Sequence, residues 1–423
     1  MLPAEALPRS WSPSDSPLRA AVQALALVVL FASGLVDLAR AIPFGPVTSQ
    51  AVLTAIYFCT GALLILIVPA RTFPIELRYL PLLIFWLWAV SSLVWTSAFR
   101  EGVQNVLVIG TMLLMFLLSD AIGATEPSFA FWLEKQLLRS VLLAVVVYGL
   151  SVLWFGKGTD EVIGARSFGL FALFGVAHNL ARWRYGSRAG LLYAIAITLL
   201  IGLSESRLSL GIAVVLFPLS QFPTHRFFHT FRAFGVLCLA AICSYSGFLY
   251  SETLQMRFFA GDASLRIGDI AINGSGRAAL WKATTRSIEE SPVFGKGAGS
   301  AEALISSQFA ELGHPHSDYL RITHDYGAVG VTVWAVAVVV LVAVLWRRWR
   351  FLDLRDRGKA RIHLTALLAL LAFMLEMTVE NSLVYVYVTA PLGLIVGSAF
   401  GIRLTRRVPG RDFLGQLETV SLP

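Results

Sequence analysis

Two histidines and an aspartate lie close together in the one long polar stretch of the chain. This stretch runs from Ser251 to Tyr326, contains His314-Pro315-His316-Ser317-Asp318, and is flanked by strongly apolar sequence. A neutral imidazole accepts a proton near neutral pH, so His316 is a candidate general base for a hydroxyl group. His316 can equally be a hydrogen-bonded turn residue, and the pattern alone leaves both interpretations open.

Three arginines indicate that the partner of these groups is an anion. Arg207 lies at the end of an apolar segment, Arg166 lies near the start of another, and Arg277 lies in the polar stretch. An arginine in or beside a membrane span usually faces a cavity or an anion, and its paired donors match phosphate oxygens. The alternatives are a snorkelling Arg207 that pairs with Glu205, and a structural role for Arg166.

Two carboxylates are candidate partners for these arginines or for a substrate. Glu376 and Glu380 lie in or near the penultimate apolar segment, where a carboxylate needs a partner. Structural pairing with one of the arginines and contact with a substrate both remain open.

A metal or nucleotide site is poorly supported. Catalytic zinc needs three convergent ligands, whereas His314 and His316 flank a proline and His324-Asp325 would have to fold back toward them. Gly295-x-Gly297-x-Gly299 lacks the spacing of a nucleotide or dinucleotide fingerprint, so we expect these glycines to shape a turn. We predict no metal and no cofactor.

The elements that must position these residues are transmembrane helices. Of the 423 residues, 57% are hydrophobic and 14% are charged, whereas roughly a quarter of a soluble protein is charged. Apolar runs of about 20 residues recur, and each is long enough to cross a bilayer as a helix. We predict an all-α polytopic membrane protein with about twelve transmembrane helices, near 18–36, 47–69, 78–97, 102–121, 136–155, 164–181, 189–204, 208–222, 232–250, 327–346, 362–379 and 383–403.

The distribution of charge predicts the orientation. A net charge of +8 would suit a nucleic-acid binder, but most of the 34 Lys and Arg residues fall on one side of the predicted spans. That bias marks the cytoplasmic side. We therefore expect cytoplasmic termini, an outward-facing polar loop and no nucleic-acid partner.

These expectations divide the chain into five parts. They are a disordered cytoplasmic tail (1–17), transmembrane helices 1–9 (18–250), a periplasmic catalytic loop (251–326), transmembrane helices 10–12 (327–403) and a cytoplasmic tail (404–423).

The loop itself should contain short helices that cover the membrane domain. Ser275 is a plausible cap for the first, and Ser300 is a plausible cap for a second that runs to about Leu312. The apolar face expected for the first helix consists of Ala278, Trp281, Thr285 and Ile288.

Several of these residues form an ordered set of motifs. Arg277-x-x-x-Trp281 is followed by Pro292-Val293-Phe294-Gly295-Lys296-Gly297, then by His316-Ser317-Asp318-Tyr319-Leu320 and Gly327-Ala328-Val329-Gly330. In this order and spacing, the set resembles the O-antigen ligase and O-antigen polymerase superfamily of bacterial envelope glycan enzymes. Ser206-Arg207 resembles the family's Ser-Arg at the start of a span. Arg166 with Asn179 is similar to an upstream motif, with a longer gap.

The resemblance implies a metal-independent glycosyltransferase at the periplasmic face of the bacterial inner membrane. The donor would be a glycan on undecaprenyl diphosphate, and the acceptor a glycan or a lipid. Carried over by position, Arg207 and Arg277 hold the diphosphate and His316 is the base. Arg166, His314 and Asp318 are further substrate-binding candidates, and Asp318 is a candidate for orienting His316. A flippase, a chain-length regulator and membrane lipids are the other partners to consider.

Three functions remain open at this point. Polymerisation of repeat units is slightly favoured over ligation to lipid A core, since both share the donor and differ in the acceptor. A transporter of a small anion or a lipid-linked glycan is the alternative from another class, although no inverted repeat is visible. Transfer onto protein would keep the same site but needs a peptide-binding surface.

Overall fold

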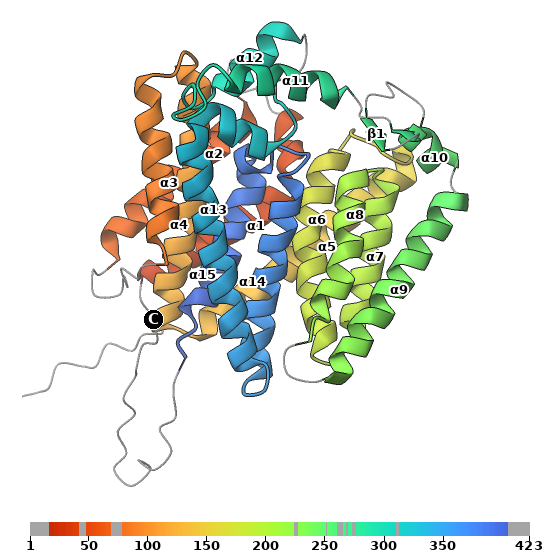
Figure 1. Cartoon of the computed structure of the whole chain (residues 1–423). Helices are drawn as coiled ribbons and strands as arrows, with labels where there is room; N and C mark the ends of the chain where they lie inside the picture. Colours follow the sequence, from red (N-terminus) through yellow and green to blue (C-terminus); the bar gives the residue numbers. More distant parts are fainter. Residues whose placement is uncertain are drawn as a thin grey trace, which may run out of the picture.

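The computed structural model describes most of the chain as a bundle of long helices. The described residues are 17–41, 48–68, 78–223, 227–250, 252–259, 265–267, 270–272, 276–309 and 313–404. The predicted tails fall almost wholly outside these residues, as do Ser275 and Leu312. Figure 1 shows the short elements α11 and α12 lying across one end of the bundle.

Nine helices precede the polar stretch in the described part of the chain. They are α1 (Pro17–Gly34), α2 (Ser49–Ile67), α3 (Leu80–Ser91), α4 (Phe99–Thr125), α5 (Ser128–Phe155), α6 (Ala165–Arg184), α7 (Arg188–Leu203), α8 (Arg207–Ser220) and α9 (Phe227–Tyr250). Two 3-10 turns, η2 (Val36–Ala41) and η4 (Ser92–Val94), lie among them.

The polar stretch and the C-terminal helices follow. The stretch contains α10 (Glu252–Phe259), β1 (Leu265–Ile267), β2 (Ile270–Ile272), α11 (Arg277–Ile288) and α12 (Ser300–Gln308). The two strands form an antiparallel pair in which Arg266 lies opposite Ala271. The chain then continues through α13 (Asp318–Leu352), α14 (Arg357–Glu376), η5 (Ser382–Val384) and α15 (Val386–Gly401).

Length and composition make this a helical membrane protein, as predicted. Among the described residues, six helices are long and apolar enough to cross a membrane: α1, α2, α4, α5, α13 and α14. Four shorter apolar helices accompany them, at Leu80–Val94, Arg188–Leu203, Arg207–Ser220 and Val386–Gly401. Apart from the single hairpin, the described regular structure is helical.

The centre of the bundle is the contact between α4 and α15, which glycines bring very close. A Cβ atom at Gly397 would lie 2.2 Å from the Phe116 carbonyl oxygen, and one at Gly393 would lie 2.4 Å from the Met112 carbonyl oxygen. Every residue of α15 is buried. Small residues that allow backbones to approach are the usual means of tight helix packing in membranes.

A break in α13 joins the polar stretch to the bundle. Gly327 has φ 65° and ψ −168°, which leaves neighbouring carbonyl groups without their helical partners. The carbonyl oxygens of His324 and Asp325 instead accept hydrogen bonds from the backbone N–H groups of Lys296 and Gly297, both at 2.9 Å. The glycine turn and the start of α13 therefore form one interlocked unit.

The buried face of α11 differs from the predicted one. The fully buried residues are Leu280, Thr284 and Ser287, whereas Thr285 is exposed. The reason is a polar contact, because the Ser287 hydroxyl lies 3.0 Å from Nε2 of His324 on α13. A search for apolar residues alone misses a helix that docks through serine and threonine.

Candidate functional site

An open pocket of about 540 Å³ lies where several helices begin. The residues that line it come from separate stretches of the chain: Gln50, Gly158, Asp160, Gly164, Ala165, Arg166, Ser167, Ser204, Glu205, Ser206, Arg207, Leu208, Arg277, Glu380, Tyr385 and Tyr387. Arg166, Arg207 and Arg277, each selected from the sequence as an anion ligand, therefore face a common space.

Helix N-termini contribute positive electrostatic potential to this pocket. Arg207 and Arg277 are the first residues of α8 and α11, and Arg166 is the second residue of α6. Gln50 stands at the same place in α2, and Tyr385 precedes the first residue of α15. Each N-terminus carries a partial positive charge and backbone N–H groups that favour anions. Five of them at one pocket make it suited to a multiply charged anion.

Carboxylates in the same pocket balance the arginines. Asp160, Glu205 and Glu380 line it together with the three guanidinium groups. The Asp160 carboxylate accepts a hydrogen bond of 2.7 Å from the backbone N–H of Ala165 and so supports the start of α6. The formal charges of the lining therefore cancel, and the helix termini leave the pocket favourable to an anion.

Glu380 is the carboxylate on which the site residues converge. Its Oε1 lies 3.3 Å from Nη2 of Arg277, while its Oε2 lies 3.6 Å from Nε of Arg166 and 3.8 Å from Nδ1 of His316. Burial by itself raises the pKa of the Glu380 carboxyl, but the neighbouring His316, Arg166 and Arg277 outweigh burial and hold that pKa below its usual value. Glu380 is therefore an anion. Of the two roles that the sequence leaves open, pairing with arginine and contact with a substrate, it has at least the first.

His316 stands beside the pocket in an unusual backbone conformation. Its φ of 52° lies in the left-handed region, which residues with a Cβ seldom adopt. The turn is held there because Asp318 N–H donates to the carbonyl oxygens of Met377 and Glu380, at 2.9 and 3.2 Å. Strained residues kept in place by their surroundings are common at functional sites. The turn with His316 and the turn with Glu380 are thus fixed to one another.

Asp318 anchors these two turns, and the expectation that it binds substrate or orients His316 stays a prediction. It is fully buried and is not among the described residues that line the pocket. One carboxylate oxygen accepts a 2.7 Å hydrogen bond from the backbone N–H of Leu383, and the other lies 2.9 Å from Arg321. The His316 ring instead lies 3.4 Å from Asn381 and 3.8 Å from Glu380.

His314 also lies apart from the pocket lining. Its Nδ1 is 3.8 Å from a carboxylate oxygen of Glu302 on α12. Burial, together with the positive charge of Arg321, lowers the pKa of the His314 imidazole to about 3. His314 is therefore neutral, and it contacts Glu302 of the polar stretch with Arg321 and Arg166 nearby.

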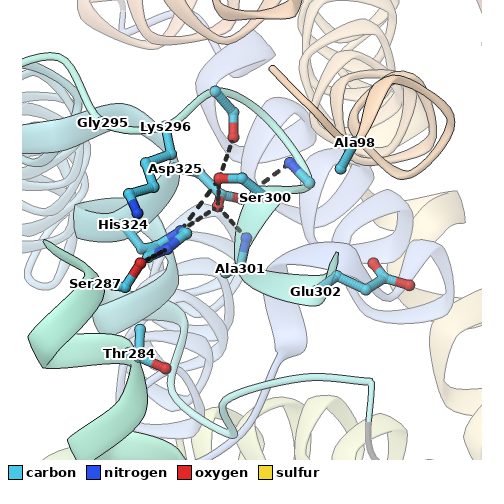
Figure 2. Close-up of polar contacts among 12 residues, drawn as sticks. Ala98, Thr284, Ser287, Gly295, Lys296, Ser300, Ala301, Glu302, His324 and Asp325 are labelled. Carbon is cyan, nitrogen blue, oxygen red and sulfur yellow. Dashed lines mark hydrogen bonds and ion pairs between the residues drawn. The ribbon is translucent and has the colours of Figure 1, made fainter. Parts of the chain in front are cut away.

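His324 and Asp325 form a buried cluster with a structural role. Figure 2 shows the Asp325 carboxylate facing the N-terminus of α12, where it accepts hydrogen bonds from the backbone N–H groups of Gly299 and Ala301, at 3.1 and 2.7 Å. The His324 ring bridges Ser287 and Ser300, with distances of 3.0 and 3.2 Å. A serine, a histidine and an aspartate in this order are reminiscent of a hydrolase, but all of them are buried and the carboxylate is occupied as a helix cap.

The glycines of the turn act as the sequence predicts. Gly295, Gly297 and Gly299 all have positive φ, and a Cβ atom on any of them would lie within 2.6 Å of another segment's backbone. In the described part of the chain, no group of three or more His, Cys, Asp or Glu side chains is placed to hold a metal ion.

Among the lining residues that were not predicted from the sequence, Tyr385 and Tyr387 have a recognisable signal. Tyr385 and Tyr387 lie at the start of α15 with their rings stacked, 5.3 Å apart. The signal is a Tyr-Val-Tyr sequence that lies shortly after Glu380 and just before a glycine-containing apolar segment. It predicts two aromatic side chains at the start of a helix. Asn179, from the upstream motif, is fully buried and bonds within α6.

Comparison with protein families finds a match over a segment that carries part of this site. Residues 185–335 match the model of the O-antigen ligase family. This match supports the resemblance of the chain to the O-antigen ligase superfamily. The matched segment includes Arg207, Arg277 and His316, and it indicates a membrane glycosyltransferase of the ligase or polymerase type. A search of curated proteins finds no match to the chain.

Proposed function

We propose that this chain moves a glycan en bloc from undecaprenyl diphosphate to an acceptor hydroxyl at the periplasmic face of the inner membrane. The observation that supports this most is the convergence of Arg166, Arg207 and Arg277 on one pocket beside His316. These residues were selected as an anion site and a base, and they come from four separate segments.

The chemistry divides between the arginines and the histidine. A diphosphate is already a good leaving group, so catalysis consists of stabilising its growing charge and removing a proton from the acceptor. The three guanidinium groups and the helix N-termini stabilise the departing diphosphate. His316 accepts the proton of the acceptor hydroxyl as that oxygen attacks the anomeric carbon, and the lipid diphosphate leaves with the electrons of the broken bond.

The orientation proposed from the charge distribution fits this chemistry. Twelve crossings follow if the six long spans and the four shorter apolar helices are joined by α6 and α9, which are 20 and 24 residues long. The starts of α2, α6, α8 and α15 then lie on the periplasmic side, with α11 and α12 above them. Both termini lie in the cytoplasm, where Arg347, Arg348 and Arg350 follow the apolar part of α13.

The acceptor defines the reaction more finely. We favour polymerisation of repeat units for an exopolysaccharide, capsule or O-antigen over ligation to a lipid A core, with a flippase delivering the donor and a regulator setting chain length. Both reactions use the same donor and the same base, so the proposed roles of the three arginines and of His316 are the same in each.

The experiment is a product analysis with purified protein in nanodiscs. The protein is incubated with undecaprenyl-diphosphate-linked glycan, either alone or with a lipid A core acceptor. Longer lipid-linked chains indicate a polymerase, and glycosylated lipid A core indicates a ligase. If neither forms while the donor crosses the bilayer of proteoliposomes, the protein is a transporter and the proposal is wrong.

A further inference from the structure

Glu380 occupies the position in the pocket that the proposed function reserves for a phosphate group. Its two oxygens lie within 3.6 Å of guanidinium nitrogens from Arg277 and Arg166. Only 5% of the residue is exposed, and it lies in the turn between α14 and η5. A carboxylate between two guanidinium groups neutralises their charges when no ligand is bound.

The same carboxylate also reaches the proposed base. Oε2 of Glu380 is 3.8 Å from Nδ1 of His316, a distance that closes to a hydrogen bond with a small rotation of the side chain. Nδ2 of Asn381 lies 3.4 Å from that same ring nitrogen and competes for it. Oε2 of Glu380 is therefore shared between Arg166 and His316, while Oε1 faces Arg277, and a closer contact with one partner weakens the contact with another.

A diphosphate is a stronger ligand for the arginines than a carboxylate. It carries more negative charge and more acceptor oxygens, and paired guanidinium donors bind phosphate oxygens in a bidentate manner. Binding of the donor headgroup therefore competes with Glu380 for Arg166 and Arg277. The carboxylate that is displaced has His316 as its nearest remaining partner.

We propose that Glu380 is a displaceable counter-ion that couples donor binding to the activation of His316. In the empty pocket it neutralises Arg166 and Arg277. When the donor diphosphate takes over these arginines, Glu380 turns to His316 and accepts the hydrogen bond from Nδ1–H, which leaves the other ring nitrogen to receive the acceptor proton. After transfer, the carboxylate neutralises the imidazolium. This role rests on the proposed function, and Glu380 acts as a positioning residue for His316.

The test uses Glu380→Gln, which keeps the size of the side chain and removes its charge. Because Arg166 and Arg277 are no longer paired with a carboxylate, we expect Glu380→Gln to bind undecaprenyl diphosphate several-fold more tightly than the wild type does. Loss of the positioned base predicts that kcat falls at least tenfold. KM and kcat therefore fall together, whereas damage to the site would raise KM while kcat falls.

Two further variants make the result interpretable. Glu376→Gln changes a buried carboxyl group one turn earlier, outside the described pocket lining, and its donor affinity should stay within about twofold of the wild type. Glu380→Asp keeps the charge and should recover part of kcat, and it serves as the test variant if Glu380→Gln fails to fold.

Specific results would overturn the counter-ion role. They are weaker binding of undecaprenyl diphosphate to Glu380→Gln, an unchanged kcat, or a Glu380→Asp variant no more active than Glu380→Gln. If the wild type makes no product, or if His316→Ala is fully active, the proposed function itself fails. If the wild type and His316→Ala behave as proposed and Glu380→Gln does not, only the role of Glu380 fails.

Discussion

At the scale of single residues, arginines and one carboxylate account for the properties of the pocket. The arginines come from α6, α8 and α11, and they face a common space with Glu380 between two of them. Charged hydrogen bonds to an anion contribute about 1.5–3 kcal/mol each. A single arginine is thus important for donor binding without being the sole determinant of it.

Substitution of Arg207 tests this directly. Arg207→Ala should weaken binding of undecaprenyl diphosphate by about 10- to 150-fold, because about 1.5–3 kcal/mol is lost and each 1.4 kcal/mol is a factor of ten. Arg188→Ala is the matched control, since Arg188 is exposed and follows the end of α6 that lies away from the pocket. Equal affinities for the two variants in a titration with purified protein would contradict the role of Arg207.

The chemistry of these residues was easier to predict from the sequence than the identity of the residues that they contact. Arginine and histidine have a small set of functions beside a membrane, so their types and order predicted Arg207, Arg277 and His316. Glu380 and Asp318 have several possible partners each. Only the fold decides that Glu380 meets two arginines, and that Asp318 is buried against Leu383 and Arg321.

At the scale of elements, the interlock between the glycine turn and α13 holds the polar stretch over the bundle. Gly327 has a positive φ, and a Cβ atom there would lie 2.2 Å from the Val293 carbonyl oxygen. Strain of this kind costs about 1–3 kcal/mol before the clash is counted. The elements that carry Arg277 and His316 are therefore positioned by a contact that only glycine permits.

Gly327→Ala should lower the thermal stability of the purified protein by several degrees and reduce transfer. The strained backbone must shift, and the loop must move with it. Gly313→Ala is the control, because Gly313 has no positive φ and open space around its Cβ position. Differential scanning fluorimetry in detergent would compare them, and equal melting temperatures would refute the interlock.

The N-terminal part of α12 should give the stability of the protein a pH dependence. Burial, with Glu101 and Asp325 acting in the same direction and Arg321 against it, raises the pKa of Glu302 to about 7. A carboxyl group with a raised pKa binds more protons in the folded state than in the unfolded state between its two pKa values. Its contribution to stability is complete below about 4.5 and is lost as the pH rises through about 7.

Glu302→Gln checks this sign. The wild type should lose thermal stability between pH 5 and pH 8 more steeply than Glu302→Gln, because the glutamine side chain does not titrate. A wild type that becomes relatively more stable than Glu302→Gln over this range would show that the pKa of Glu302 is not raised.

The boundaries of these elements were only partly predictable. The break at Gly327 coincides with the predicted start of a span, since the last polar residues and the glycines mark it. The prediction of the buried face of α11 was wrong because this helix packs through a polar contact between Ser287 and His324. Ser300 was predicted as a cap, yet Gly299 precedes α12 and the cap is Asp325, which is distant in sequence.

At the scale of the whole molecule, function depends on which side of the membrane the pocket faces. Long apolar runs made the helical membrane class predictable, since each span is a local property of the sequence. The gathering of four segments at one pocket is a property of the packing, above all of α15 against α4, and local sequence does not reveal it.

Cysteine labelling tests the orientation. In a variant with Cys59, Cys238 and Cys243 replaced by serine, Ser307→Cys on α12 should react with a membrane-impermeant maleimide added to spheroplasts. Arg188→Cys should react only after the membrane is opened. The reverse pattern would place the polar stretch in the cytoplasm and remove the basis for a periplasmic reaction.

The most direct test of the account is single-turnover transfer by purified protein already loaded with undecaprenyl-diphosphate-linked glycan. General-base catalysis contributes about 10²–10⁴-fold, so His316→Ala should bind the donor with near wild-type affinity and transfer the glycan at least 100-fold more slowly. His314→Ala, from the same turn but beside Glu302 rather than Glu380, should keep most of the wild-type rate. Transfer by His316→Ala at the wild-type rate would contradict the account.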